Sequence, residues 1–185
     1  MTAETIKDSE RRMQKAVEAA QHDFATIRTG RANPLILEGI NVDYYGTPTP
    51  LNQLAGISAP EPRMLMVTPW DRGVIDAICK AIQASDLGLT PQSDGNVIRL
   101  NIPYLTEERR KDLIKQLHKK SEEHKVAIRN IRRDANEQIK NQKNKSEISE
   151  DDMKREQEEV QKLTDKYIAE VDKLTQAKEA ELREV

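Results

Sequence analysis

Basic side chains are concentrated on one face of a predicted helix that spans Leu105 to Lys143. At about 100° per residue, an apolar stripe forms along this helix and a cationic band lies beside it. The stripe contains Leu113, Leu117, Ile128, Ile131, Ala135 and Ile139. The band, which we call the basic ribbon, contains Lys111, Lys115, Lys125, Arg129, Arg132, Arg133, Lys140 and Lys143, with His118, Asn136 and a single acid, Glu122. Such a band of cations can bind a polyphosphate backbone.

The centre of the basic ribbon is arginine, which favours a binding role. Arginine presents a bidentate fork to phosphates, whereas lysine suffices for solubility. The other acids of the helix fall on different faces: Asp112, Glu123, Asp134 and Glu137. Few i,i+4 pairs therefore neutralise the ribbon. Two alternatives stay open: a charged face can serve solubility alone, and Arg132 lies close enough to the stripe to have a packing role.

The kind of nucleic acid follows from what surrounds the arginines. Aromatic residues do not interleave with them, which argues against single-strand binding by base stacking. A rigid helix with a cationic face instead suggests docking onto folded RNA through shape and phosphate contacts. Duplex DNA is compatible with the charge, but no helix-turn-helix or basic-zipper fork is visible. Arg110 falls on the apolar stripe itself, where a structural ion pair is an equal alternative.

No constellation for catalysis is present in the sequence. His22, His118 and His124 show no metal-ligand spacing, and His124 falls on the apolar stripe, where a bundle role is expected. No P-loop, GxSxG or GxGxxG pattern occurs. Cys79 is expected to be a small buried hydrophobe, not a nucleophile. The acidic pairs at 151–152 and 158–159 form a solvated face. We therefore expect no enzyme, no cofactor and no metal.

Composition narrows the class of protein. The chain has 185 residues, 36% of them apolar and 34% charged, with one Phe and one Trp. These values suit long helices that pack along narrow seams. A formal net charge of −2 argues against indiscriminate coating of nucleic acid. The single cysteine suits a reducing compartment. No secretory signal or apolar run of about 18 residues is visible, so we expect a cytoplasmic protein that does not span a membrane.

Three helical segments flank a β-rich middle. Residues 5–29 carry an apolar stripe that stops at Gly30, a plausible C-terminal cap. The third helix begins at Ser149, with Asp152 completing an imperfect capping box, and its heptad track contains Val160, Leu163, Tyr167, Val171, Leu174, Glu181 and, beside its end, Leu182. Thr106 is expected to cap the second helix. None of the stripes can be buried alone, which favours an antiparallel three-helix bundle.

Residues 31–104 differ from the helical segments. Most of the prolines and six of the seven glycines lie there. Strands are predicted at 40–45, 64–68 and 97–102, separated by turn signals at 46–48, 59–60 and 93–95. Residues 71–85 form a predicted amphipathic helix whose inward positions are Val74, Ile75, Ile78 and Ile82. The prediction is an α+β chain: a bundle of residues 1–30 and 105–185, with 31–104 inserted as a small β/α/β domain. Motion between the two is expected at the linkers, Gly30–Arg31 and Pro103–Leu105.

Five stretches together resemble the bacterial ribosome recycling factors over nearly the whole chain. They are Arg28–Pro34, Val42–Leu51, Ser85–Leu89, Leu105–Leu113 and Arg129–Asn136. The resemblance implies an elongated, L-shaped protein that binds the post-termination ribosome with elongation factor G. GTP hydrolysis by that partner then splits the subunits and frees messenger and transfer RNA.

The resemblance also implies roles for particular residues. The family's RNA-contacting arginines correspond to Arg129, Arg132 and Arg133, then to Arg110 and Arg28, and we add Lys125 from the basic ribbon. The bundle is expected to lie on large-subunit ribosomal RNA, and the small domain and hinge to face elongation factor G. The predicted hinge consists of Gly30, Arg31, Pro103, Tyr104 and Leu105, with Tyr104 standing where the family commonly has a second proline.

A rival class remains open at this level. A helical scaffold or chaperone would bind protein through the seam or the small domain, and the basic ribbon would then serve solubility only. Sedimentation with 70S particles and with isolated large subunits, in low and high salt, separates the two classes. The chain is expected to act as a monomer.

Overall fold

The computed structural model describes residues 2–184 and divides into two compact units. The first consists of the chain up to Phe24 together with Lys111–Glu184, and the second is Ala25–Arg110. The predicted division at 30/31 and 104/105 differs from these limits by six residues on each side (24 against 30, 110 against 104). One reason lies in residues 25–33, where the Asn33 side chain donates to the Ala25 carbonyl at 3.0 Å. Whether the predicted boundaries separate independently folding parts stays a prediction.

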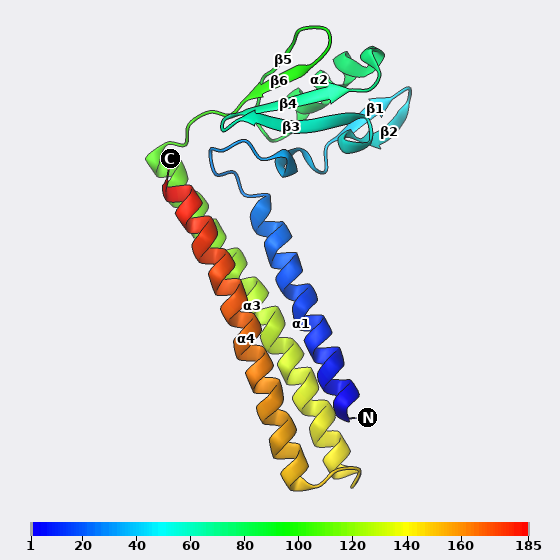
Figure 1. Cartoon of the computed structure of the whole chain (residues 1–185), viewed down its shortest axis with the longest axis vertical. Coiled ribbons are helices and arrows are strands. Elements are labelled where there is room, and N and C mark those ends of the chain that lie inside the picture. The colour runs from blue at the N-terminus through cyan, green and yellow to red at the C-terminus, as the bar shows by residue number, and fades with distance from the viewer. Residues whose placement is uncertain (1, 185) are drawn as a thin grey trace. The chain divides into compact units, whose positions relative to one another are not determined.

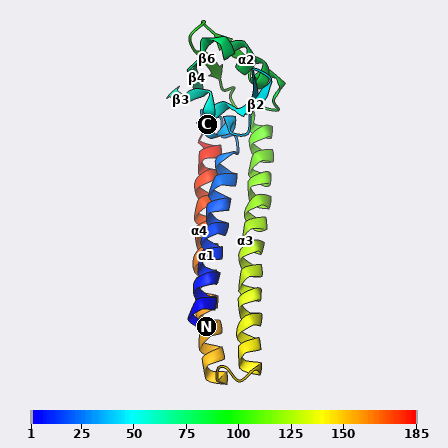
Figure 2. The same cartoon turned by 90° about the vertical axis from the view of Figure 1, so that its right-hand side faces the viewer.

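Three long helices lie side by side in the first unit (Figures 1 and 2). They are α1 (Thr2–Ala25), α3 (Glu107–Asn144) and α4 (Glu150–Arg183). Their order along the chain makes α3 antiparallel to the other two, so the predicted antiparallel three-helix bundle is confirmed. Cross-helix hydrogen bonds tie it together, including Tyr167 Oη to Glu10 at 3.2 Å and Thr175 Oγ1 to Ser121 Oγ at 2.8 Å.

Helix termini follow their predicted caps in two cases out of three. Thr106 Oγ1 accepts from the Arg109 N–H at 3.1 Å, and Ser149 with Asp152 forms a complete capping box before α4. The first helix is the exception, because it ends at Ala25 and not at residue 29. The side chain of Asn33 donates to the carbonyl of Ala25, the last residue of the helix. Gly30, five residues beyond, takes a φ of +78°.

The apolar seams are buried largely as predicted. All six stripe residues of α3 are buried, as are Met13, Ala20 and Phe24 of α1. On α4 the heptad track needs a correction. Leu163 and Leu174 are only half-buried, and the seam runs through polar positions, which are Glu156, Thr164, Thr175 and Lys178. Threonine fits there because its hydroxyl bonds the carbonyl four residues back, as in Thr164 to Val160 at 2.8 Å.

The second unit contains six strands and the helix α2. The strands β1 (Asn41–Tyr44) and β2 (Thr47–Pro50) form a hairpin. The other four form an antiparallel sheet in the order β3–β4–β6–β5, with bounds Ala55–Glu61, Met64–Pro69, Ile98–Asn101 and Pro91–Ser93 for β3, β4, β6 and β5. Short 3₁₀ helices occupy Pro34–Leu37, Leu51–Gln53 and Arg72–Val74.

Helix α2 (Ile75–Ala84) covers one face of the sheet (Figure 1). Val74, Ile75, Ile78 and Ile82 are buried against sheet residues such as Leu65, Val67 and Leu100, as the amphipathic pattern predicted. Cys79 is half-buried beside this core, and burial raises its thiol pKa, which keeps it protonated and unreactive. The mixed α+β class with a helical bundle and a small sheet domain is confirmed.

Three strands were missed by the sequence pattern, and all three carry proline. They are β2, β3 and β5, which lie at sheet edges or in the hairpin. Proline cannot donate to a ladder, but it is tolerated at an edge or a bulge. The predicted turn at 59–60 was therefore wrong: it is an irregularity inside β3, where the pairing register shifts between Ser58 and Glu61. Thr47 and Pro48, also predicted as turn, begin β2.

Candidate RNA-binding site

Helix α3 carries the whole basic ribbon, and the side chains of the ribbon differ in their exposure to solvent. Lys115, Arg133 and Lys140 are exposed to solvent, whereas Lys125, Arg129 and Arg132 are half-buried. The apolar stripe beside them is buried, so the ribbon forms the border between the bundle core and solvent. Long cationic side chains suit this border because their stems cover apolar surface while their charged ends stay in water.

Helix α4 lies alongside the basic ribbon and supplies most of its partners. Lys125 Nζ pairs with Asp172 Oδ1 at 2.5 Å, and His118 Nε2 lies 3.0 Å from Glu179 Oε2. Arg132 donates to the neutral amide oxygen of Gln161 at 3.2 Å. The ribbon is thus less isolated from acids than its own helix indicated, because these acids lie on another helix, 47 and 61 residues further along the chain than their partners.

Glu122 is the only acid within the basic ribbon, and it pairs with Arg129. The two side chains meet at 2.7 Å between Nη1 and Oε1. The hydrogen bond from Arg129 holds the pKa of Glu122 below its ordinary value. Arg129 is therefore partly compensated in the free protein, and a phosphate would have to replace Glu122 as its partner.

Arg132 and Arg133 keep their charge uncompensated. The partner of Arg132 is a neutral amide, and within residues 2–184 no hydrogen-bonding or ionic partner is found for Arg133, which is exposed. Solubility alone does not require arginine at these two positions, because a pair of lysines would serve as well. This pair can donate to phosphate oxygens without first giving up an acidic partner.

The α1 side of α3 has the opposite character, because its charges are paired within the bundle. Asp23 accepts from Lys120 at 2.6 Å and lies 3.0 Å from His124 Nε2. His124 also packs edge-on against Phe24, with ring centroids 5.8 Å apart. Burial acts to raise the pKa of Asp23, but the hydrogen bonds with Lys120 and His124 outweigh it and lower that pKa below its ordinary value. The expected bundle role of His124 is confirmed, and this side offers little free charge to RNA.

The remaining predicted RNA-binding arginines lie in the second unit. Arg28 is half-buried and donates to the backbone carbonyl of Asp86 at 2.8 Å. Burial, with repulsion from Arg109, lowers its pKa. Arg110 is half-buried in the first turn of α3. Contact of either residue with RNA stays a prediction, and the structure gives Arg28 a local role in holding the segment at Asp86.

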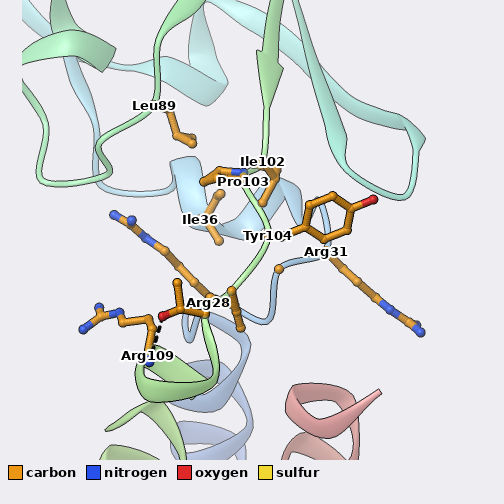
Figure 3. A pocket seen from close by; sticks show the side chains of 11 residues that line it. Arg28, Arg31, Ile36, Leu89, Ile102, Pro103, Tyr104 and Arg109 are labelled. Atoms are coloured by element: carbon orange, nitrogen blue, oxygen red, sulfur yellow. Dashed lines mark hydrogen bonds between the residues drawn. The ribbon is translucent and has the colours of Figure 1, made fainter. Parts of the chain in front are cut away.

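All five predicted hinge residues line one cavity of about 230 Å³ in the second unit (Figure 3). Its other walls are mostly apolar and include Ile36, Leu89 and Ile102. Gly30 is buried here with a φ of +78°, a conformation that favours glycine. Tyr104 is 72% exposed, and the guanidinium of Arg63 lies over its ring.

Other kinds of site find little support in residues 2–184. No group of three or more His, Cys, Asp or Glu side chains is arranged to hold a metal ion in this part of the chain. Nor does any helix described there have the length and apolar character needed to cross a bilayer.

If the basic ribbon binds RNA, replacing Glu122 by Gln should tighten that binding. The change releases Arg129 from its acidic partner without altering side-chain size, so about one more phosphate contact should form. We expect affinity to rise by roughly threefold to tenfold at low salt, and the slope of log Kd against log salt to steepen by about 0.7–0.9.

The matched control is Glu137→Gln, which removes the same charge from another face of α3. Both variants would be measured by filter binding to large subunits across a salt series. Equal effects of the two variants would mean that net charge alone, and not the ribbon, sets the affinity.

Comparisons with known proteins agree with this geometry. The model of the ribosome recycling factor family matches residues 20–182. The ribosome-recycling factor of Heliobacterium modesticaldum is 58% identical over 185 residues and is covered completely, as is this chain. That of Carboxydothermus hydrogenoformans is 58% identical over 182 residues, with 98% of each chain covered.

Solved structures extend the likeness to three dimensions. A solution structure of a ribosome recycling factor shares 46% identity at a TM-score of 0.78, covering 100% of this chain and 98% of the other. A second, the T. thermophilus ribosome recycling factor with E. coli elongation factor G bound to the E. coli post-termination complex, shares 47% identity at a TM-score of 0.69 and covers 98% of both chains. With the bundle, the sheet domain and the full-length match in agreement, this chain belongs to the ribosome recycling factor family.

Proposed function

We propose that this chain recycles ribosomes after termination by laying the basic ribbon of α3 on large-subunit ribosomal RNA. Membership of the family supports the reaction, and a structural relative bound to the post-termination complex with elongation factor G supports the partners. GTP hydrolysis by elongation factor G then drives subunit separation and release of messenger and transfer RNA.

The observation that carries the RNA contact is the uncompensated pair Arg132 and Arg133. Lys120 and Lys125, by contrast, have carboxylate partners at 2.6 and 2.5 Å. The arginine pair has none in the described residues, and it lies on a helix held rigid by a buried seam. A rigid cationic edge can read the spacing of phosphates without stacking on bases.

We propose further that the second unit acts on the partner while the bundle stays docked. Gly30 can accommodate a large change in its backbone dihedral angles, whereas the ring of Pro103 restricts the backbone of the second connection. The residues Gly30, Arg31, Pro103, Tyr104 and Leu105 would serve as the hinge. The chain itself would catalyse no reaction, since the chemistry belongs to the GTPase partner, and it would act in the cytoplasm as a monomer.

Salt dependence tests the assignment to RNA directly. If Lys125, Arg129, Arg132 and Arg133 each neutralise one phosphate, log Kd should change with log salt with a slope of about 3. Raising monovalent salt fourfold, from about 50 to 200 mM, should therefore weaken binding by roughly 60-fold. The measurement is the dissociation constant for large subunits across that range.

The scaffold alternative predicts another result. A contact made of apolar groups with a protein loses little affinity over the same salt range. A flat dependence would thus favour a protein partner for the bundle and contradict the proposed contact. Sedimentation with 70S particles under both conditions provides an independent check.

A further inference from the structure

Besides Tyr104 of the predicted hinge, two large aromatic side chains of the second unit are exposed to solvent. Tyr45 is 73% exposed and Trp70 is 70% exposed, and Trp70 is the only tryptophan of the chain. Most of the other large apolar side chains of this unit lie in its core. Exposed tryptophan and tyrosine side chains are typical of contact sites for other proteins.

Asp71 connects the two aromatics. It follows Trp70 directly in the chain, and its Oδ2 accepts from the Tyr45 hydroxyl at 3.2 Å. Its Oδ1 accepts from the Gly73 N–H at 2.8 Å, which fixes the turn into α2. We call Tyr45, Trp70 and Asp71 the aromatic patch. The hydrogen bond between Tyr45 and Asp71 joins the tip of the β1–β2 hairpin to the segment that follows β4.

The backbone beneath the aromatic patch is held in place. Tyr45 has a φ of +48°, which is rare for a bulky residue, in a two-residue turn with Gly46 at +88°. The Asp43 carboxylate accepts from the Gly46 N–H at 2.7 Å and stabilises this turn. The Trp70 N–H donates to the Leu54 carbonyl at 3.1 Å. The rings are thus presented on a rigid frame, which reduces the entropy lost on binding.

Charge around the aromatic patch disfavours RNA as its occupant. Residues 31–104 contain five Lys or Arg against seven Asp or Glu: Arg31, Arg63, Arg72, Lys80 and Arg99 against Glu38, Asp43, Glu61, Asp71, Asp76, Asp86 and Asp94. Two of the acids, Asp43 and Asp71, lie in the patch or directly under it. Bases that stack on aromatics bring phosphates with them, and those phosphates need nearby cations.

We propose that the aromatic patch docks a basic surface of elongation factor G. Arginine or lysine of the partner would lie over the Trp70 or Tyr45 ring and pair with the Asp71 carboxylate. Each oxygen of that carboxylate can accept a further hydrogen bond besides the one it already accepts. The inference rests on the proposed function, in which the second unit faces that partner. It adds the partner-facing residues and the sign of the charge on the surface they meet.

The test is a titration of elongation factor G in a subunit-splitting assay with the full-length protein. Trp70→Ala should raise the concentration of elongation factor G needed for half-maximal splitting by about tenfold or more. Asp71→Asn should raise it by roughly threefold, since one charge is lost from the contact. Arg72→Glu should lower it by a similar factor at low salt, because it adds an acid beside the patch.

Two controls separate this contact from the contact with the ribosome. Each variant should bind 70S particles without elongation factor G within about twofold of the unmodified protein, and Gln92→Ala, on the exposed strand β5, should leave splitting unchanged. Should Trp70→Ala unfold, as judged by thermal melting, the opposite responses of Asp71→Asn and Arg72→Glu still decide the question.

Three outcomes would overturn the proposal. One is an unchanged half-maximal concentration in Trp70→Ala and Asp71→Asn. Another is a shift of the same sign in Asp71→Asn and Arg72→Glu, which would exclude a basic partner surface. The third is an equal loss of 70S binding without elongation factor G, which would assign the patch to the ribosome. Failure of the proposed function would look different, because the unmodified protein would then not bind or split ribosomes at all.

Discussion

Arg132→Glu should weaken binding to large ribosomal subunits by about 2–4 kcal/mol, which is roughly 30-fold to 1,000-fold. A charge-assisted contact with phosphate is lost, and the new carboxylate repels the backbone that remains. The fold should tolerate the change, since Arg132 is half-buried and donates only to the neutral Gln161. Helical content by circular dichroism should stay the same.

Lys15→Glu is the matched control for this change. It reverses the same charge at an exposed position of α1, on a helix that does not carry the ribbon, and should alter affinity by less than about threefold. Binding would be measured by sedimentation at one fixed salt concentration. A folded Arg132→Glu protein with unchanged affinity would refute the assignment of this face.

Removal of the small domain should abolish splitting and leave binding. Joining Gly30 to Leu105 through a short Gly/Ser linker keeps α1, α3 and α4, whose cross-helix contacts lie within the bundle. The product should be soluble, highly helical and able to bind the large subunit within about tenfold, because the basic ribbon is intact. Splitting with elongation factor G and GTP should fall to background, since the unit proposed to face that partner is missing.

Two measurements judge this division of labour. Circular dichroism and thermal melting establish whether the shortened chain forms a cooperative bundle, and light scattering follows subunit separation. The full-length protein carrying Gln92→Ala serves as the splitting-competent reference. A shortened chain that splits subunits normally, or one that cannot fold, would contradict the proposed roles of the two parts.

The helices and their seams were predictable because their information is local and repeated. Every stripe residue of α3 is buried, and Ser149 and Thr106 cap the helices as their residue types indicated. The strands were harder, because a proline such as Pro60 or Pro91 counts against a strand unless the strand lies at an edge. Whether a strand is at an edge depends on pairing that a single sequence does not contain.

The position of the basic ribbon on one face of α3 was predictable, but the side chains that pair with its arginines were not. The angular positions of Arg129 and Arg132 on α3 follow from helical geometry alone. Their partners do not, because Gln161 comes from α4 and Glu122 lies seven residues back along α3, outside the usual i,i+4 spacing. The aromatic patch was missed for a related reason: Tyr45 and Asp71 are 26 residues apart in the sequence, and only the fold brings their side chains into contact.

The buried hydrogen bond between Ser121 and Thr175 has a mechanical consequence for the bundle. Two helices that met only through aliphatic side chains could slip past each other by one turn, about 5.4 Å, at modest cost. Slippage here would separate the buried Ser121 hydroxyl from its Thr175 partner, at a penalty of about 1–3 kcal/mol, while Thr175 would keep its bond to the Val171 carbonyl at 2.8 Å. The hydrogen-bonded pair therefore resists axial sliding of α3 along α4. A load applied to one end of the rod during subunit separation would be carried to the other end without loss of alignment.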